Sequence, residues 1–119
     1  MSKMKPKTII CDIDGVLVVH KNRGLSEQLN SKLLEGAVKK FNEWDSNGYN
    51  IILITGRRES MRRETSEQLK FCGIFYDTLI MGVGGGDRVL INDRKPNSSR
   101  DTAYAINLNR NEGVKDVKV

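Results

Sequence analysis

Carboxylates and phosphate-binding groups occur at three points of the chain, each directly after a short apolar run. They are Asp12 and Asp14, then Thr55-Gly56-Arg57, and then Asn92-Asp93. Ligands bind at the carboxyl ends of the strands of an open parallel sheet, so these groups would converge on one site. Two carboxylates two residues apart suit Mg²⁺, which prefers hard oxygen ligands. A simple Asx turn is the alternative for an isolated Asp-x-Asp-Gly string, but three such strand ends together favour a site.

Strands and helices that would position these groups alternate along the sequence, which predicts an α/β fold with a Rossmann-like parallel sheet flanked by helices. Apolar spacing between Leu33 and Trp44 predicts one helix, and the charged stretch from Arg58 to about Cys72 predicts a mostly exposed second helix anchored by Met61, Leu69 and Phe71. The expected strands are Thr8 to Cys11, Tyr49 to Ile54, Thr78 to Met81, Arg88 to Ile91 and an edge strand from Ala103 to Leu108.

Length and composition bound the class of protein. The 119 residues fit one domain, with a basic leader over residues 1–6 and a flap over residues 15–30. With 38% hydrophobic and 29% charged residues, the composition excludes disordered, collagen and coiled-coil classes. No apolar run is long enough for a membrane span, and the start of the chain does not resemble a signal peptide, so we expect a cytoplasmic protein without a membrane partner.

Charge and cysteine content add less. The net charge of +5 is compatible with nucleic acid, but phosphate-handling enzymes and ordinary solvated surfaces are also basic. Cys11 and Cys72 lie far apart and form no metal-type pair, so we expect two free thiols.

Three motifs resemble those of the haloacid dehalogenase (HAD) superfamily. The string from Asp12 to Leu17 resembles its first motif, the run from Ile52 to Arg57 its second, and Leu90 to Asp93 its fourth. Their order and spacing match over about residues 7–108, nearly the whole chain. The resemblance implies a phosphatase with a HAD-type sheet and a minimal cap.

Roles follow from that resemblance position by position. Asp12 is the expected nucleophile, forming an aspartyl-phosphate, and Asp14 the general acid and then base. Thr55, with Gly56 and Arg57, would bind the phosphate. The resemblance also implies Mg²⁺ as cofactor, and its implied ligands are Asp12, Asp14, Asp93 and, as a helper or water holder, Asn92.

The chain departs from the family pattern at two places. Val16 stands where many members have Thr, and the stretch Gly82-Val83-Gly84-Gly85-Gly86 lacks the basic residue of the third motif. We expect Lys95 to supply the missing positive charge, with Arg57 as second choice. Arg88 is the third possibility, but on a regular strand it would lie roughly 16 Å from the metal end.

A site without a cap either accepts a large substrate or is closed by another subunit. The favoured interpretation is a Mg²⁺-dependent phosphatase for a small phosphorylated metabolite such as a sugar phosphate, by analogy only. The alternatives are a polynucleotide-end phosphatase, with nucleic acid as the less favoured partner, and a weakly active binding or regulatory module. We also expect a homo-oligomer whose interface approaches the flap between Val18 and Leu25.

Overall fold

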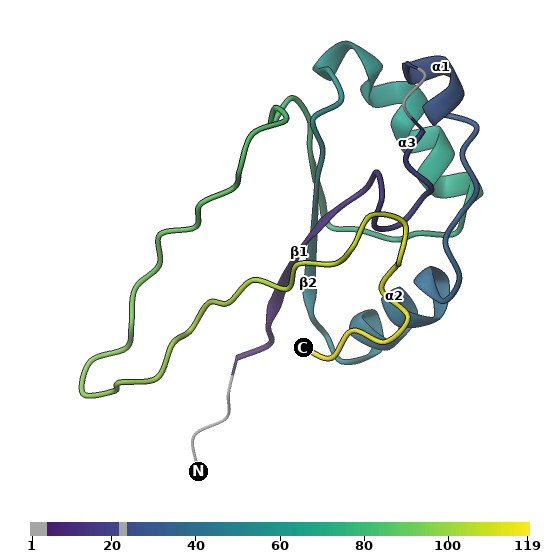
Figure 1. Cartoon of the computed structure of the whole chain (residues 1–119). Helices are drawn as coiled ribbons and strands as arrows, with labels where there is room; N and C mark the ends of the chain where they lie inside the picture. The colour runs from purple at the N-terminus through teal and green to yellow at the C-terminus, as the bar shows by residue number, and fades with distance from the viewer. Residues whose placement is uncertain (1–4, 22–23) are drawn as a thin grey trace.

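The computed structural model describes residues 5–21 and 24–119, and its centre is a parallel three-stranded sheet (Figure 1). The strands are β1 (Thr8–Asp12), β2 (Asn50–Ile54) and β3 (Thr78–Ile80), in the order β1-β2-β3. Asp12 pairs in register with Ile54, and Ile54 with Ile80, so the three carboxyl ends meet at one edge. The predicted α/β class and parallel sheet are confirmed.

Helices follow the strands and cover one face of this sheet. The order along the chain is α1 (Leu25–Gln28) and α2 (Ala37–Ser46) after β1, and a 3₁₀ turn η1 (Glu59–Met61) with α3 (Arg62–Phe71) after β2. Figure 1 shows α2 and α3 on the same side of the strands. The core between the two layers is formed by Phe41 and Trp44 of α2, Leu69 of α3, and Leu53 of β2. Among the described helices, none combines the length and apolar character needed to cross a bilayer.

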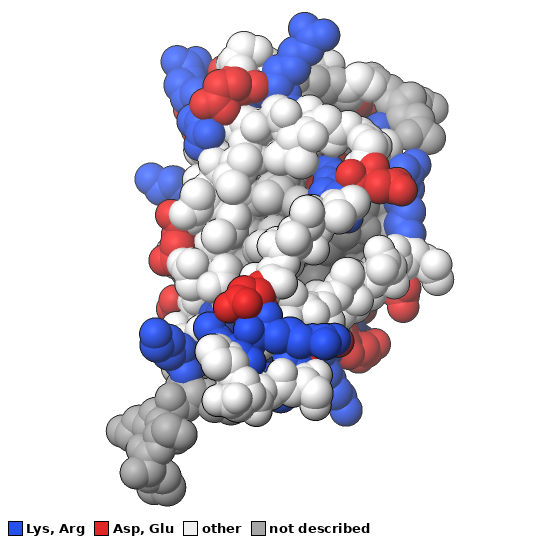
Figure 2. Space-filling view, turned by 90° about the vertical axis from the view of Figure 1, so that its left-hand side faces the viewer, with Lys and Arg blue, Asp and Glu red and all other residues white. Residues whose placement is uncertain are grey.

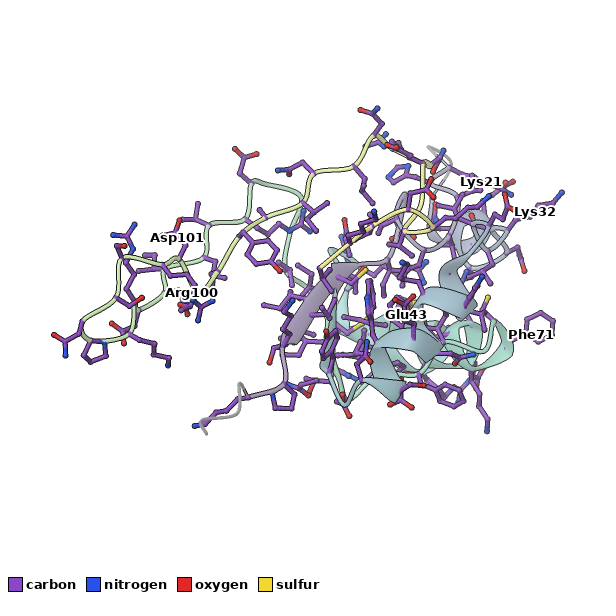
Figure 3. The ribbon with its side chains drawn as sticks, turned by 90° about the horizontal axis from the view of Figure 1, so that it is seen from below. Lys21, Lys32, Glu43, Phe71, Arg100 and Asp101 are labelled. Atoms are coloured by element: carbon purple, nitrogen blue, oxygen red, sulfur yellow. The ribbon has the colours of Figure 1, made fainter. Side chains whose placement is uncertain are left out.

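Both predicted helices form, with two differences. Leu33 and Leu34 precede α2 instead of belonging to it, because Gly36 at the helix start has a left-handed backbone with φ 83° and ends the preceding loop. Phe71 is not an anchor of α3, since its side chain is 93% exposed and points away from the body in Figure 3. That prediction is wrong because residue 71 ends the helix on its outer side, and Leu69 alone reaches the core from this last turn.

Residues 84–108, which we call the arm, run away from the sheet and return (Figure 1). No helix or strand forms in the arm, so the predicted strands Arg88 to Ile91 and Ala103 to Leu108 are both wrong for this conformation. The physical reason is the lack of a partner: no backbone N–H of the arm donates to a backbone carbonyl anywhere in the described chain. Side chains join the two limbs, with Arg94 donating to Asp101 at 2.8 Å.

The segment after the arm returns to the body and packs against the flap. The N–H of Asn111 donates to the carbonyl of Gly15 at 2.8 Å, and its side-chain Oδ1 accepts from the N–H of His20 at 2.7 Å. Val114 is buried in the core. At the base of the flap, Leu17 and Val18 are also fully buried, so the described part of the flap is a fixed element of the body.

Candidate active site

Asp12, Asp14 and Thr55 lie together at the carboxyl edge of the sheet, as their positions in the sequence predict. Asp12 is the last residue of β1, and Thr55 is the first residue after β2, one position beyond the partner of Asp12. Asp14 follows in the turn that opens the flap, where the N–H of Gly15 donates to the carbonyl of Val18 at 2.8 Å. The parallel register therefore brings the two carboxylates and the hydroxyl to one edge.

Asp12 is half-buried, and burial raises the pKa of its carboxyl above the usual value. The hydrogen bond from the N–H of Ile13 to its Oδ1, at 2.9 Å, and the positive charge of Arg88 both lower this pKa without cancelling the effect of burial. The carboxylate is thus poorly solvated and has one oxygen fixed by the backbone. Such a group is held in place to act as a nucleophile once an opposing positive charge is present.

Arg57 holds the carboxylate of Asp14 with two parallel hydrogen bonds. Its Nη2 lies 2.7 Å from Asp14 Oδ1 and its Nε lies 3.1 Å from Asp14 Oδ2. The remaining nitrogen, Nη1, donates to Thr65 Oγ1 at 3.1 Å and to Gln68 Oε1 at 2.7 Å, both on α3. Arg57 is only 7% exposed. Arg57 is therefore the hydrogen-bonded partner of Asp14. Its Nε and Nη1 groups are fully used in contacts within the protein.

The same network continues to the flap. Gln68 Nε2 donates to the carbonyl of Gln28 at 3.1 Å, and the side chain of Gln28 bonds to the backbone of Val19 and Lys21. A chain of hydrogen bonds therefore runs from Asp14 through Arg57 and α3 to the flap. This connection could not be predicted from the sequence, because glutamines in short helices form no recognisable motif.

Thr55 is fully buried, and its Oγ1 accepts a hydrogen bond from the N–H of Arg57 at 3.1 Å. The hydroxyl proton is consequently directed elsewhere and is available to a phosphate oxygen. Gly56 allows the loop after β3 to approach, since a Cβ at this position would lie 3.0 Å from the carbonyl oxygen of Gly84. Thr55 and Gly56 thus form a close-packed edge where a phosphate could contact backbone and hydroxyl groups.

Asn92 and Asp93, the third predicted group, do not lie at this edge of the sheet in the single chain (Figure 1). Asn92 and Asp93 lie in the arm, where Asn92 Nδ2 donates to Thr102 Oγ1 and the Thr102 hydroxyl donates to the carbonyl of Asp93, both at 2.7 Å. Lys95 is also exposed in the arm, which extends away from the carboxyl ends of the strands in Figures 1 and 3. In the described part of the chain, no three His, Cys, Asp or Glu side chains gather as metal ligands.

Arg88 does not lie on a regular strand, and its charge lowers the pKa of Asp12. The chain leaves the sheet at Gly82, so the distance estimated for a strand from Arg88 to Ile91 does not apply. Arg88 Nη2 donates to the carbonyl of Gly84 at 3.2 Å, beside Gly56, and its charge acts on Asp12. Arg88 is therefore one of the basic residues whose charge acts on Asp12 in the described chain, an effect that the expected extended strand does not predict.

Comparison with known proteins gives one family match and several similar solved structures. The model of the family "Polynucleotide kinase PNKP phosphatase domain", a HAD family, matches residues 6–101. A solved Pnkp1/Rnl/Hen1 complex is 30% identical, with a TM-score of 0.58 over 71% of this chain and 30% of that one. A second structure of the Pnkp1/Rnl/Hen1 RNA repair complex is 28% identical, with a TM-score of 0.57 over 80% of this chain and 28% of that one. This chain therefore spans less than a third of the length of either.

A more distant structure supports the fold alone. The D,D-heptose 1,7-bisphosphate phosphatase from B. bronchiseptica, complexed with magnesium and phosphate, is 19% identical, with a TM-score of 0.50 over 68% of this chain and 52% of that one. No curated protein sequence matches the chain.

Proposed function

Because the chain belongs to the HAD family of polynucleotide kinase PNKP phosphatase domains, we propose that it removes terminal phosphates from polynucleotides by way of a phosphorylated Asp12. As a member of this family it is a HAD-type phosphatase. The observation that carries the proposal is the convergence of Asp12, Asp14 and Thr55 at one edge of the sheet. This edge combines a nucleophile, an acid or base, and a phosphate-binding hydroxyl.

The proposed reaction has two halves. In the first, an oxygen of Asp12 bonds to phosphorus while the bond from phosphorus to the leaving oxygen breaks, and protonated Asp14 gives its proton to that oxygen. In the second, the oxygen of a water molecule bonds to phosphorus while the bond from phosphorus to the Asp12 oxygen breaks, and Asp14 takes a proton from the water. Inorganic phosphate leaves and the Asp12 carboxylate is restored. Thr55 binds an oxygen of the transferred group throughout.

Arg57 acts in this scheme as a positioning residue for Asp14. Its two hydrogen bonds fix the plane of the Asp14 carboxylate at the edge of the sheet where Asp12 lies.

Mg²⁺ is the proposed cofactor, because the donors at this edge are hard oxygens. Mg²⁺ is commonly bound by one or two carboxylates together with water and substrate phosphate, which the Asp12 carboxylate and the backbone carbonyl of Asp14 can provide. When bound, the ion would cancel charge on the attacked phosphate. Asp93, the further ligand implied by the motif, lies in the arm.

A polynucleotide end is the preferred substrate for three reasons. The matching family is named for a polynucleotide kinase phosphatase domain, and the 28% identical structure is that of an RNA repair complex. The chain carries a net charge of +5, which favours a polyanion. The sugar-phosphate relative is 19% identical and supports the fold alone, so the small-metabolite interpretation becomes the second candidate.

Phosphate release from a substrate panel tests the proposal. The panel contains oligonucleotides with a 3′ or a 5′ phosphate, a sugar phosphate and para-nitrophenyl phosphate, each with Mg²⁺ or with excess chelator. We expect turnover of an oligonucleotide end with Mg²⁺ and none in the Asp12→Asn variant. Preference for the sugar phosphate would refute the substrate, and full activity under chelation would refute the cofactor.

A further inference from the structure

The arm carries a β-type sequence that has no partner within one chain. Val89, Leu90 and Ile91 are 84%, 61% and 91% exposed, and no backbone hydrogen bond supports them. Three consecutive exposed residues of this type are unusual on the surface of a soluble protein, because such apolar runs usually pair with a sheet. A segment of this length without secondary structure inside a compact domain is also uncommon.

The sheet has a matching unpaired edge. β1 lies at the end of the strand order, so its outer edge has no neighbouring strand among the described residues. Ile10, in the middle of β1, is 50% exposed, and Ile80 of β3 is also exposed on the sheet face that α2 and α3 leave free. Figure 2, which looks from the side of the arm, shows an uncharged centre with charged side chains around it. An open edge beside an apolar face is a template for one more strand.

The molecule is more extended than a compact chain of its length, because the arm projects from the body (Figure 1). The radius of gyration is 15.3 Å, whereas a compact chain of this length is expected to have about 13.5 Å. Both ends of the arm are fixed to the body, by Val83 N–H on the Thr55 carbonyl and by Asn111 N–H on the Gly15 carbonyl. The arm can therefore reach a second molecule without any change at these anchors.

We infer that two copies of this chain exchange arms, residues 88–91 of each adding as a parallel strand to the free edge of β1 in the other. The exchange is reciprocal, so it closes as a two-fold dimer and leaves neither apolar run exposed. In a parallel pair residues advance together by about 3.3 Å, so Leu90 and Ile91 beside Ile10 and Cys11 place Asn92 level with Asp12 of the other copy, and Asp93 one residue further along. Each site is then completed by a carboxylate from the second chain.

This inference rests on the proposed function only for its activity readout. The key experiment combines two variants, Asp12→Asn and Asp93→Asn, co-expressed with different tags and purified through both. If the arms are exchanged, each site combines Asp12 of one chain with Asp93 of the other. In the heterodimer one site then contains both substitutions and the other site contains neither. We expect each variant alone to be inactive and the heterodimer to have about half the turnover of the parent dimer. An inactive heterodimer would overturn the exchange, because it would show that Asp12 and Asp93 act within one chain.

The mass in solution provides a second, independent test. Size-exclusion chromatography with light scattering is expected to give twice 13.4 kDa for the parent, and 13.4 kDa for Ile91→Arg. Because the Ile91 side chain is 91% exposed, the substitution leaves the fold of a single chain intact, which circular dichroism checks. Arg100→Ala, an exposed change at the end of the arm, is the matched control and should remain dimeric.

The two tests separate failure of the interface from failure of the activity. A parent dimer that dissociates with Ile91→Arg, but hydrolyses no phosphate, would refute the proposed function and support the exchange. A parent monomer that hydrolyses phosphates well would support the function and overturn the exchange.

Discussion

Arg57→Ala is expected to destabilise the protein strongly and to reduce its activity. The substitution removes four hydrogen bonds made by one buried guanidinium, two to Asp14 and two to α3. The Asp14 side chain is 18% exposed, so its carboxylate would remain largely desolvated without a partner. Breaking a buried ion pair by removing one member typically costs about 3–5 kcal/mol, and the partial exposure of Asp14 favours the lower end, about 3 kcal/mol.

The change in melting temperature follows from the size of the chain. Unfolding entropy is about 2.1 cal/mol/K per residue, or roughly 0.25 kcal/mol/K for 119 residues. A loss of about 3 kcal/mol therefore lowers the melting temperature by roughly 12 °C. Differential scanning calorimetry measures this shift. Arg58→Ala is the matched control, because the neighbouring Arg58 is exposed, and it should change stability by less than about 0.5 kcal/mol.

Activity should fall as well, because an unheld Asp14 no longer meets the reacting oxygen. General acid and base groups contribute about 10²- to 10⁴-fold, so we expect turnover of the best substrate to fall at least about 100-fold. Arg57→Lys keeps the charge but cannot form the paired contact, and should recover only part of the loss. Equal melting temperatures for Arg57→Ala and Arg58→Ala would refute the reasoning, since they would show that the buried pair adds nothing to stability.

Three other predictions follow from burial and backbone geometry. Burial raises the pKa of Asp12, so its negative charge opposes folding above that pKa and has no effect at low pH. Asp12→Asn should therefore raise the melting temperature of the metal-free protein at neutral pH, with no gain below about pH 4. Thermal unfolding measured across this pH range checks the prediction. Burial raises the pKa of the Cys11 thiol to about 12, so mass spectrometry after alkylation of native protein at pH 8 should find Cys11 unmodified, and modified only after unfolding. Gly36→Ala should destabilise more than Gly48→Ala in urea unfolding, because both have positive φ but only a Cβ at position 36 would meet Lys115, at 2.8 Å.

Local patterns predicted the sheet and the first half of the site. The apolar runs of β1, β2 and β3 end at the residues that carry chemistry, and parallel pairing then places Asp12, Asp14 and Thr55 together. The position of a motif directly after an apolar strand depends only on neighbouring residues, so it can be predicted from the sequence.

Long-range partners could not be predicted in the same way. Arg57 was interpreted as a phosphate contact, but its partner Asp14 lies 43 residues away, and no local pattern shows which carboxylate a guanidinium will meet. The run from Arg88 to Ile91 has the composition of a strand, yet a strand also needs a neighbour, which depends on the whole fold. The same limit applies to the start of α2, where the left-handed backbone of Gly36 overrides the apolar spacing of Leu33 and Leu34.

The contact of Asn111 with the flap joins parts of the chain that are far apart in sequence. Its side chain holds His20, 91 residues earlier in the chain, and its N–H holds the carbonyl of Gly15, next to Asp14. Contacts between such distant residues close large loops, whose entropy cost must be met before the contact is stable, and they form late in folding. We therefore expect the turn that carries Asp14 to reach its final position late in folding, when residues 109–114 dock against the flap.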